Sequence, residues 1–178
     1  PLDNWDVSNV LRMQQMFFGA SDFDQPLDLW NVSSVTNMAE MFYDASAFDK
    51  PLNSWNVSSV TTMYQMFLNA RAFNRDLNSW IVSNVTDMQQ MFQGATNFDG
   101  IISGWDTSSV TNMAGMFSGA NNFSRPLNSW NVSNVTSLNF TFEARKFTQD
   151  LSGWDTSSVT KMQGTFKNAL VFNQDLSD

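Results

Sequence analysis

The chain has 178 residues, enough for one domain with a sizeable core, and its formal net charge is −8. This acidity argues against nucleic-acid binding, which needs a basic surface, and against docking on an anionic membrane. The absence of cysteine and histidine excludes disulfides, thiolate catalysis, Cys-based zinc sites and Ser-His-Asp catalysis. Apolar runs are only a few residues long, so we expect no segment to span a membrane.

The dominant feature is a 25-residue repeat. Tryptophan occurs at positions 5, 30, 55, 80, 105, 130 and 154, so five spacings are 25 residues and the last is 24. The consensus is roughly P-L-N-S-W-N-V-S-S-V-T-x-M-x-x-M-F-x-G-A-x-x-F-N-x. A period of this length predicts stacked units that cannot fold singly. We therefore expect one repeat domain over residues 1–178, and its start at Pro1 rather than Met predicts a piece of a larger protein.

Each repeat is expected to begin with a short strand around its tryptophan. In the second repeat, Trp30 and Val32 alternate with Asn31, as in a strand that buries one face. The same pattern recurs in every repeat, so we expect parallel strands whose tryptophans are buried and stacked on one another. These strands are centred on Trp5, Trp30, Trp55, Trp80, Trp105, Trp130 and Trp154.

The second half of each repeat is expected to form a short helix. Apolar residues recur there at helical spacing, in the second repeat at Val35, Met38, Met41, Phe42 and Ala45. Serine or threonine before this run is suited to an N-cap, and Gly, Asn or Asp after it to a left-handed C-cap. The sequence thus predicts an α/β solenoid, a stack of about seven 25-residue coils, each with a short parallel β-strand and a short helix.

The spacing Leu27-x-x-Trp30-x-Val32-x-x-Val35 resembles the leucine-rich-repeat signature, except that its ninth position holds Val instead of Asn or Cys. The block W-N-V-S-S-V-T-x-M-x-x-M-F, followed by A-x-x-F-N, resembles the BspA-like leucine-rich-repeat surface proteins, in particular the mycoplasma-type 25-residue repeat of bacterial surface lipoproteins. This resemblance implies a right-handed solenoid displayed at the cell surface, with adhesion or host-recognition roles. It implies no catalytic residue, cofactor or metal, so we expect a non-enzymatic, extracellular protein.

The residues that follow the tryptophans form one candidate recognition surface. They are short and polar in most repeats, as at Asn31, Asn56, Asp106 and Asn131. Two interpretations remain open: a hydrogen-bonding face for a protein or glycan, or asparagine ladders that hold the coils in register. Leu29 and Ile81 place large apolar side chains among these polar positions, which favours a contact site.

A second candidate surface is an apolar stripe in the first three repeats. Phe18, Tyr43 and Leu68 occupy a position that later repeats fill with Gln, Ser, Glu and Lys. We expect these three side chains either to form an exposed patch near the N-terminal end or to tuck against the neighbouring turn.

The sixth repeat departs from the pattern. It has Leu138 and Thr141 in place of methionines and lacks one residue between Phe142 and Phe147. One interpretation is a neutral deletion. The other is a local contact site, with Tyr64 and Phe140 as aromatic anchors and Arg145 and Lys146 as cations for an acidic partner.

Two functional classes follow from these observations. The first is a recognition module that binds an unknown protein or glycan, as in adhesion. The alternative is a structural spacer or scaffold subunit within a larger surface assembly. Neither end of the sequence has a capping repeat, so we also expect flanking polypeptide or another subunit to cover the ends.

Overall fold

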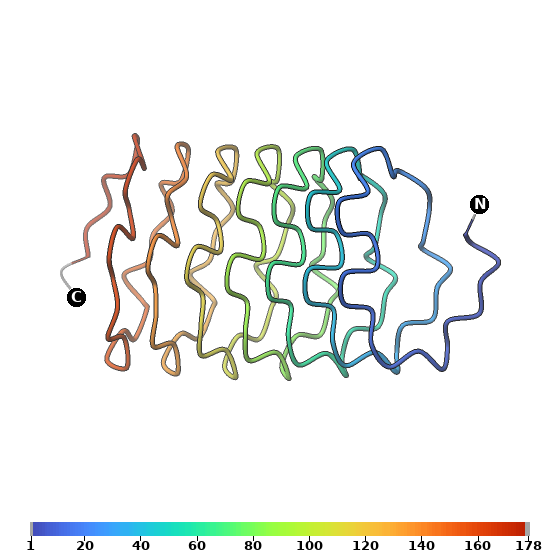
Figure 1. Cartoon of the computed structure of the whole chain (residues 1–178). Coiled ribbons are helices and arrows are strands. Elements are labelled where there is room, and N and C mark those ends of the chain that lie inside the picture. Colours follow the sequence, from blue (N-terminus) through green and yellow to red (C-terminus); the bar gives the residue numbers. More distant parts are fainter. Residues whose placement is uncertain (1, 177–178) are drawn as a thin grey trace.

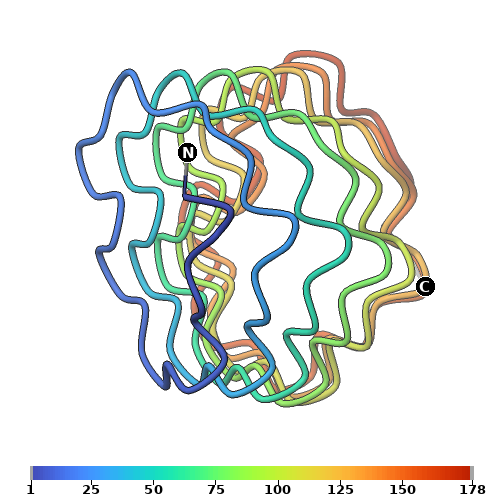
Figure 2. The same ribbon diagram turned by 90° about the vertical axis from the view of Figure 1, so that its right-hand side faces the viewer.

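The computed structural model describes residues 2–176, which form a single stack of coils running from the N-terminal to the C-terminal end (Figure 1). Viewed from its N-terminal end, the stack shows successive coils nested behind one another (Figure 2). Each coil corresponds to one repeat, and we number the coils by their tryptophans, from Trp5 in the first to Trp154 in the seventh.

The expected α/β solenoid is wrong. Residues 2–176 contain no helix and no continuous strand, and each coil consists of turns and irregular segments. The regular pairing between coils is a row of isolated parallel bridges, located seven residues after each tryptophan and not at the tryptophan itself. The bridges are Arg12↔Asn37, Asn37↔Thr62, Thr62↔Asp87, Asp87↔Asn112, Asn112↔Ser137 and Ser137↔Lys161.

The backbone hydrogen bonds explain why the expected helix does not form. In the second coil, the N–H groups of alternate residues donate to the carbonyl three residues earlier and close successive turns, at Met41, Tyr43 and Ala45. The N–H groups between them donate to the third coil, from Met38, Glu40, Phe42 and Asp44. An α-helix instead needs each N–H to bond the carbonyl four residues earlier. Successive turns also bring every third or fourth residue inside, which produced the helical spacing.

Two positions in the coil adopt a left-handed backbone, which also prevents a continuous helix. The first is filled by Gln15, Glu40, Gln65, Gln90, Gly115, Phe140 and Gly164. The second, which the sequence had indicated as a helix C-cap, is filled by Gly19, Asp44, Asn69, Gly94, Gly119 and Asn168. Gly, Asn and Asp are the residues that best tolerate this conformation. The sixth coil has no residue at the second position because of its deletion.

Tryptophan and phenylalanine ladders form the core. Burial is confirmed for the six tryptophans from Trp30 to Trp154, which are at most 9% exposed, whereas Trp5 in the first coil is 56% exposed. Each of these six indole N–H groups donates to a carbonyl of the preceding coil, at 2.9 to 3.1 Å. Phenylalanine rings stack between coils, as Phe42 does on Phe67 with centroids 5.4 Å apart. The core therefore keeps the coils in phase through both apolar packing and buried hydrogen bonds.

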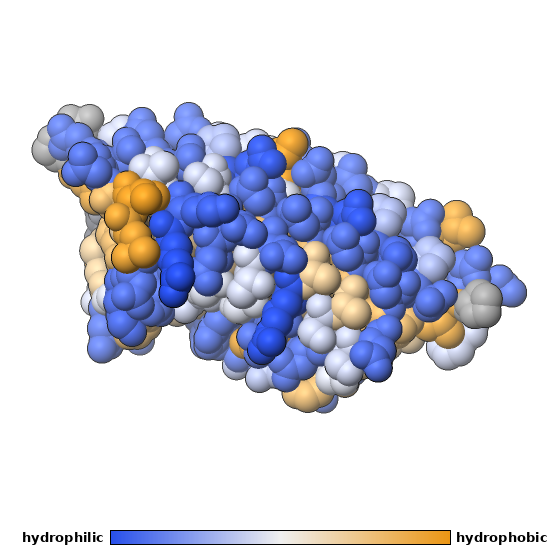
Figure 3. Space-filling model, turned by 90° about the horizontal axis from the view of Figure 1, so that it is seen from above, coloured by the Kyte–Doolittle hydropathy of each residue, from blue (hydrophilic) through white to orange (hydrophobic). Residues whose placement is uncertain are grey.

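The ends of the stack lack the partners that neighbouring coils supply elsewhere. Within residues 2–176, the N–H groups that would link the seventh coil to a further one have no acceptor, at Met162, Gly164, Phe166 and Asn168. Leu170 and Val171 are 73% and 53% exposed, and hydrophobic surface gathers at the C-terminal end of the upper face (Figure 3). A further polypeptide at an end of the stack stays a prediction.

Candidate functional site

The polar side chains directly after the tryptophans are hydrogen-bonded within their own turns. The side-chain oxygen of Asn31 accepts a hydrogen bond from the backbone N–H of Ser33, and the equivalent bond recurs at 3.0 to 3.2 Å in Asp6, Asn56, Asp106, Asn131 and Asp155. Hydrogen bonds from Ser108 lower the pKa of Asp106 below its ordinary value, against a smaller opposing effect of burial. These bonds stay within one coil, so they stabilise turns and do not form a ladder between coils.

The two apolar interruptions of this surface are exposed but separate. Leu29 is 73% exposed and Ile81 is 59% exposed. They belong to the second and fourth coils, so a whole coil lies between them. The structure therefore does not combine them into one patch.

The expected N-terminal stripe is smaller than the sequence indicated. Phe18 is 48% exposed and stacks on Tyr43, with ring centroids 4.4 Å apart. Leu68 is only 6% exposed, so for this residue the second alternative holds, in which the side chain tucks against its neighbours. The exposed part of the stripe is the pair of aromatic rings.

A groove of about 450 Å³ runs from the third to the seventh coil, and we call it the trough. Its origin is a gap at the second left-handed position, where Asn69 and Asn168 carry side chains but Gly94 and Gly119 do not, and where the sixth coil lacks the residue altogether. The groove is lined by Asn69, Gln93, Gly94, Ser118, Gly119, Asn121, Glu143, Arg145, Asn168 and Leu170.

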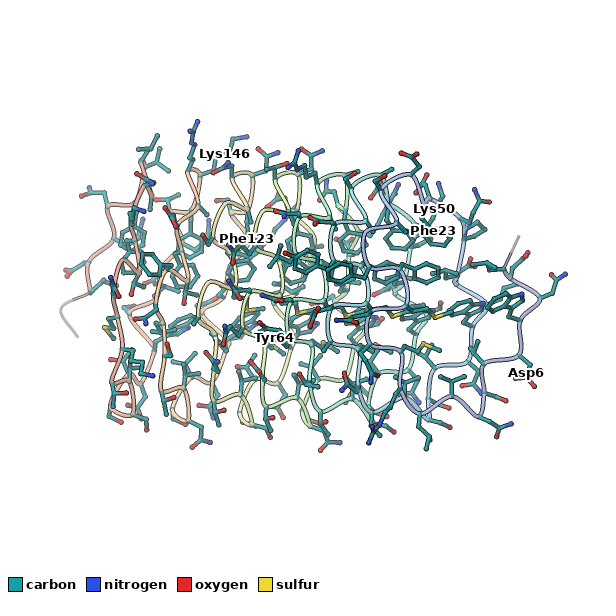
Figure 4. All side chains as sticks on the ribbon, in the orientation of Figure 1. Asp6, Phe23, Lys50, Tyr64, Phe123 and Lys146 are labelled. Carbon is teal, nitrogen blue, oxygen red and sulfur yellow. The ribbon has the colours of Figure 1, made fainter. Side chains whose placement is uncertain are left out.

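A second hollow of about 400 Å³ adjoins the trough and shares Gln93, Ser118 and Glu143 with it. Phe140 lines this second hollow, so the structure brings Phe140 and Arg145 to one continuous concave surface. Neither Tyr64 nor Lys146 lines it. Figure 4 shows Lys146 at the upper edge of the stack, well separated from Tyr64. Two of the four residues proposed for the sixth-coil contact are thus placed together.

Phe140 has an unusual environment. Its backbone is left-handed, with φ 55°, which is strained for a bulky residue. A Cβ on Gly164 would lie 2.5 Å from the Phe140 ring, so the glycine in the seventh coil leaves room for this ring. The Nζ of Lys167 lies 5.7 Å from the ring centroid, within the range of a cation–π contact.

Glu143 is the carboxylate of the trough, and three neighbours hold it. The hydroxyl of Ser118 and the amide of Asn168 each donate to it at 3.0 Å, and Lys167 forms an ion pair at 3.2 Å. Burial raises the pKa of Glu143, but these hydrogen bonds and the charge of Lys167 together lower it below its ordinary value. Glu143 is therefore a fixed, compensated anion.

The trough was not among the sites that the sequence indicated. The sequence did carry a sign of it. The same position of the repeat holds glycine in the fourth and fifth coils, at Gly94 and Gly119, and is deleted in the sixth. The sequence pattern places this position at the end of a helix, where glycine needs no further explanation. Recognising the position as an outward-facing side-chain ladder required the turn geometry.

Within residues 2–176, no three acidic side chains are grouped closely enough to hold a metal ion. Over the same range, no helix has the length and hydrophobicity needed to cross a membrane.

Comparison with known families gives one match. A family described as "Mycoplasma protein of unknown function, DUF285" matches residues 1–100 and again residues 76–178, which together cover the whole chain. No curated protein matches the chain. The match agrees with a mycoplasma-type repeat, and it carries no link to leucine-rich repeats.

Proposed function

The chain belongs to this mycoplasma protein family of unknown function, and we propose that it is a non-enzymatic recognition module that binds a protein or glycan in the trough, outside the cell. The observation that carries this proposal is a break in an otherwise periodic surface. Stacking requires inner positions to repeat, whereas an outer position is free to vary. Three successive coils lack a side chain at one outer position, and the trough lies at this position.

The size and lining of the trough support recognition of a polar ligand. Its volume of about 450 Å³ lies in the range typical of small-molecule sites. Four amide side chains and the hydroxyl of Ser118 line it, and an amide offers both hydrogen-bond donors and acceptors. Phe140 in the adjoining hollow adds an aromatic ring. Such a lining suits hydroxyl-rich or amide-rich ligands, which are sugars and peptides.

The state of Glu143 supports a non-enzymatic role. A general base or acid works best with a pKa near the working pH. Hydrogen bonds lower the pKa of Glu143 and occupy both carboxylate oxygens. This carboxylate is therefore suited to hold the wall of the trough and not to transfer protons.

A structural spacer is the second candidate function, favoured by bonds that run along the stack. Lys50 pairs with Asp24 and Arg75 with Asp49, each at 2.6 Å and each between adjacent coils. These pairs strengthen a rod without creating a ligand site. A spacer has no need of the trough, so variants that fill the trough separate the two functions.

The test is a screen of glycan and protein arrays with the wild-type chain, followed by a variant that fills the trough. Gly119→Asn restores the side chain that Asn69 and Asn168 carry at the same left-handed position. The matched control is Gly19→Asn, which makes the same change at an open site in the first coil, where a Cβ meets nothing within 4 Å.

We expect Gly119→Asn to weaken binding at least tenfold, about 1.4 kcal/mol, and Gly19→Asn to leave it unchanged. Thermal melts of both variants check that the fold is retained. Equal binding by both variants would place the ligand elsewhere. If no array component binds the wild-type chain, the spacer function is favoured.

A further inference from the structure

The trough has an uncompensated positive charge. Within residues 2–176, the ion pairs involve Lys50, Arg75, Arg125 and Lys167, and none includes the exposed Arg145. Glu143, the acidic residue of the lining, is already matched by Lys167. The guanidinium of Arg145 is therefore available for an anionic group in the trough.

The floor of the trough is closed to main-chain pairing. The N–H of Gly94 donates to the Ser118 carbonyl at 2.7 Å, and the N–H of Gly119 donates to the Glu143 carbonyl at 2.8 Å. A peptide that bound as an added strand would need such groups to be free. This pairing argues against an extended peptide and for a ligand held by side chains.

The walls retain free hydrogen-bonding groups on side chains. The amide of Asn121 makes no side-chain hydrogen bond within residues 2–176, and Asn69 donates to Asp44 through its nitrogen at 2.8 Å while its oxygen stays free. Gly94 has no side chain, and the amide of Asn69 lies over it, where a Cβ would otherwise be. The amides of Asn69 and Asn121 and the guanidinium of Arg145 belong to the third, fifth and sixth coils, so together they match successive units of a sugar chain, whose hydroxyl groups both donate and accept.

We infer that the trough binds a glycan that carries a carboxylate, such as a hexuronic acid unit. Arg145, in the sixth coil, pairs with the carboxylate of one sugar unit, and the amides of Asn121 and Asn69, in the fifth and third coils, bond hydroxyls of neighbouring units. The inference rests on the proposed function and narrows its ligand from a protein or glycan to an acidic sugar.

The charge of the whole chain limits this ligand further. The net charge of −8 repels a dense polyanion, and this repulsion weakens beyond roughly 8–10 Å at physiological ionic strength. A glycan with isolated acidic units fits the trough better than a highly sulfated chain.

The test uses short hexuronic-acid oligosaccharides, each paired with its carboxyl-reduced counterpart, and two charge-matched variants. Arg145→Gln removes the cation of the trough. Lys146→Gln makes the same charge change at the next residue, which is exposed and does not line the trough. Affinities are measured by titration calorimetry of the whole 178-residue chain.

We expect the wild-type chain and Lys146→Gln to prefer the acidic form about tenfold over the reduced form, as for a charged hydrogen bond, and Arg145→Gln to lose this preference. Equal affinity for the two sugar forms, or an equal loss in both variants, overturns the inference. Failure to bind the acidic sugars while another array ligand binds overturns it too, but leaves the proposed function standing. An array without any binding contradicts both.

Discussion

The third and sixth coils have the same core but different outer surfaces. In the third coil, Met63, Met66 and Phe67 are fully buried. Four alternate N–H groups link this coil to the fourth, from Met63, Gln65, Phe67 and Asn69. In the sixth coil, Leu138 and Thr141 replace the methionines and remain at most 3% exposed. Only three such links remain there, because the residue that corresponds to Asn69 is missing; the N–H of Ala144, the next residue, bonds the carbonyl of Phe142 at 2.7 Å.

The difference shows which positions of the repeat are constrained. Thr141 fits the core because its hydroxyl donates to the carbonyl of Met113 at 3.0 Å, which satisfies its polar group. The outer turn loses a residue and one link, yet Phe142 and Phe147 still stack 4.2 Å apart. Inner ladders thus keep the phase while the outer turn is free to vary, and the trough lies where it varies.

The largest expected effect concerns the ladder that both coils share. Trp80→Ala removes a side chain that is 2% exposed and whose indole N–H bonds the carbonyl of Leu52. We expect a loss of about 3–5 kcal/mol in the free energy of unfolding, measured by urea denaturation. Trp5→Ala, at the exposed first coil, is the control and should cost much less. Equal losses would show that burial in the stack does not determine the contribution of a tryptophan.

A smaller effect is expected at the glycine that makes room for Phe140. Gly164→Ala places a Cβ against the Phe140 ring at a left-handed position with φ 61°. We expect a loss of about 1–3 kcal/mol, since strain at the backbone and overpacking add. Gly19→Ala, with φ 70° and open space, carries the backbone cost alone.

A double variant separates the two contributions. Gly164→Ala combined with Phe140→Gln restores a residue type that the first, third and fourth coils have at the position of Phe140. We expect the double variant to lose less stability than the sum of the single variants. Additive losses would mean that Phe140 and Gly164 are not coupled.

The core substitution of the sixth coil should have a modest effect. Thr141→Val keeps the shape of the side chain but removes the buried hydrogen bond to Met113. We expect a loss of about 0.5–1.5 kcal/mol, measured by thermal and urea unfolding. Ser118→Ala, at the outer turn, is the comparison for a hydroxyl that is only partly buried. A neutral Thr141→Val would show that the hydroxyl is tolerated and not used.

The sequence predicted the period and the burial of six of the seven tryptophans, because stacking forces inner residues to repeat every 25 positions; it was wrong for Trp5, which has no preceding coil in the described stack. It did not predict the coil conformation. A run of turns and an amphipathic helix both bury every third or fourth residue, so the spacing alone does not distinguish them. The residues with a left-handed backbone do distinguish them, because such residues interrupt a helix. Gln65 and Gln90 adopt that conformation in these coils, although glutamine gives no sign of it in a sequence.

The candidate site was predicted only in part for a related reason. The irregular sixth coil was visible as a 24-residue spacing, and Phe140 and Arg145 do lie on one concave surface. The trough itself depends on which positions face outward, and a helix and a series of turns assign different positions to the surface. Lys146 follows Arg145 directly in the sequence but does not line the trough, a distinction that only the geometry makes.

The smallest expected effect concerns pH and the wall of the trough. Burial raises the pKa of Glu143, but its bonds with Lys167, Ser118 and Asn168 outweigh burial and lower the pKa in the folded chain. A carboxyl whose folded pKa lies below its unfolded pKa stabilises the fold at every pH above the unfolded value. This contribution is lost as the pH falls from the ordinary glutamate pKa through the lower folded value. Glu143→Gln should therefore cost about 0.5–1 kcal/mol at neutral pH, and its stability should converge with that of the wild-type chain in acid.

Urea unfolding of both proteins across this pH range measures the difference, and Lys167→Gln serves as the comparison because it removes the cation but leaves Ser118 and Asn168. If the ion pair dominates, Lys167→Gln removes most of the pH-dependent difference. If the hydrogen bonds from Ser118 and Asn168 dominate, most of the pH-dependent difference remains in Lys167→Gln. A difference between the wild-type chain and Glu143→Gln that stays constant with pH would contradict the lowered pKa. In that case the wall of the trough would be held by packing and not by the ionised carboxylate.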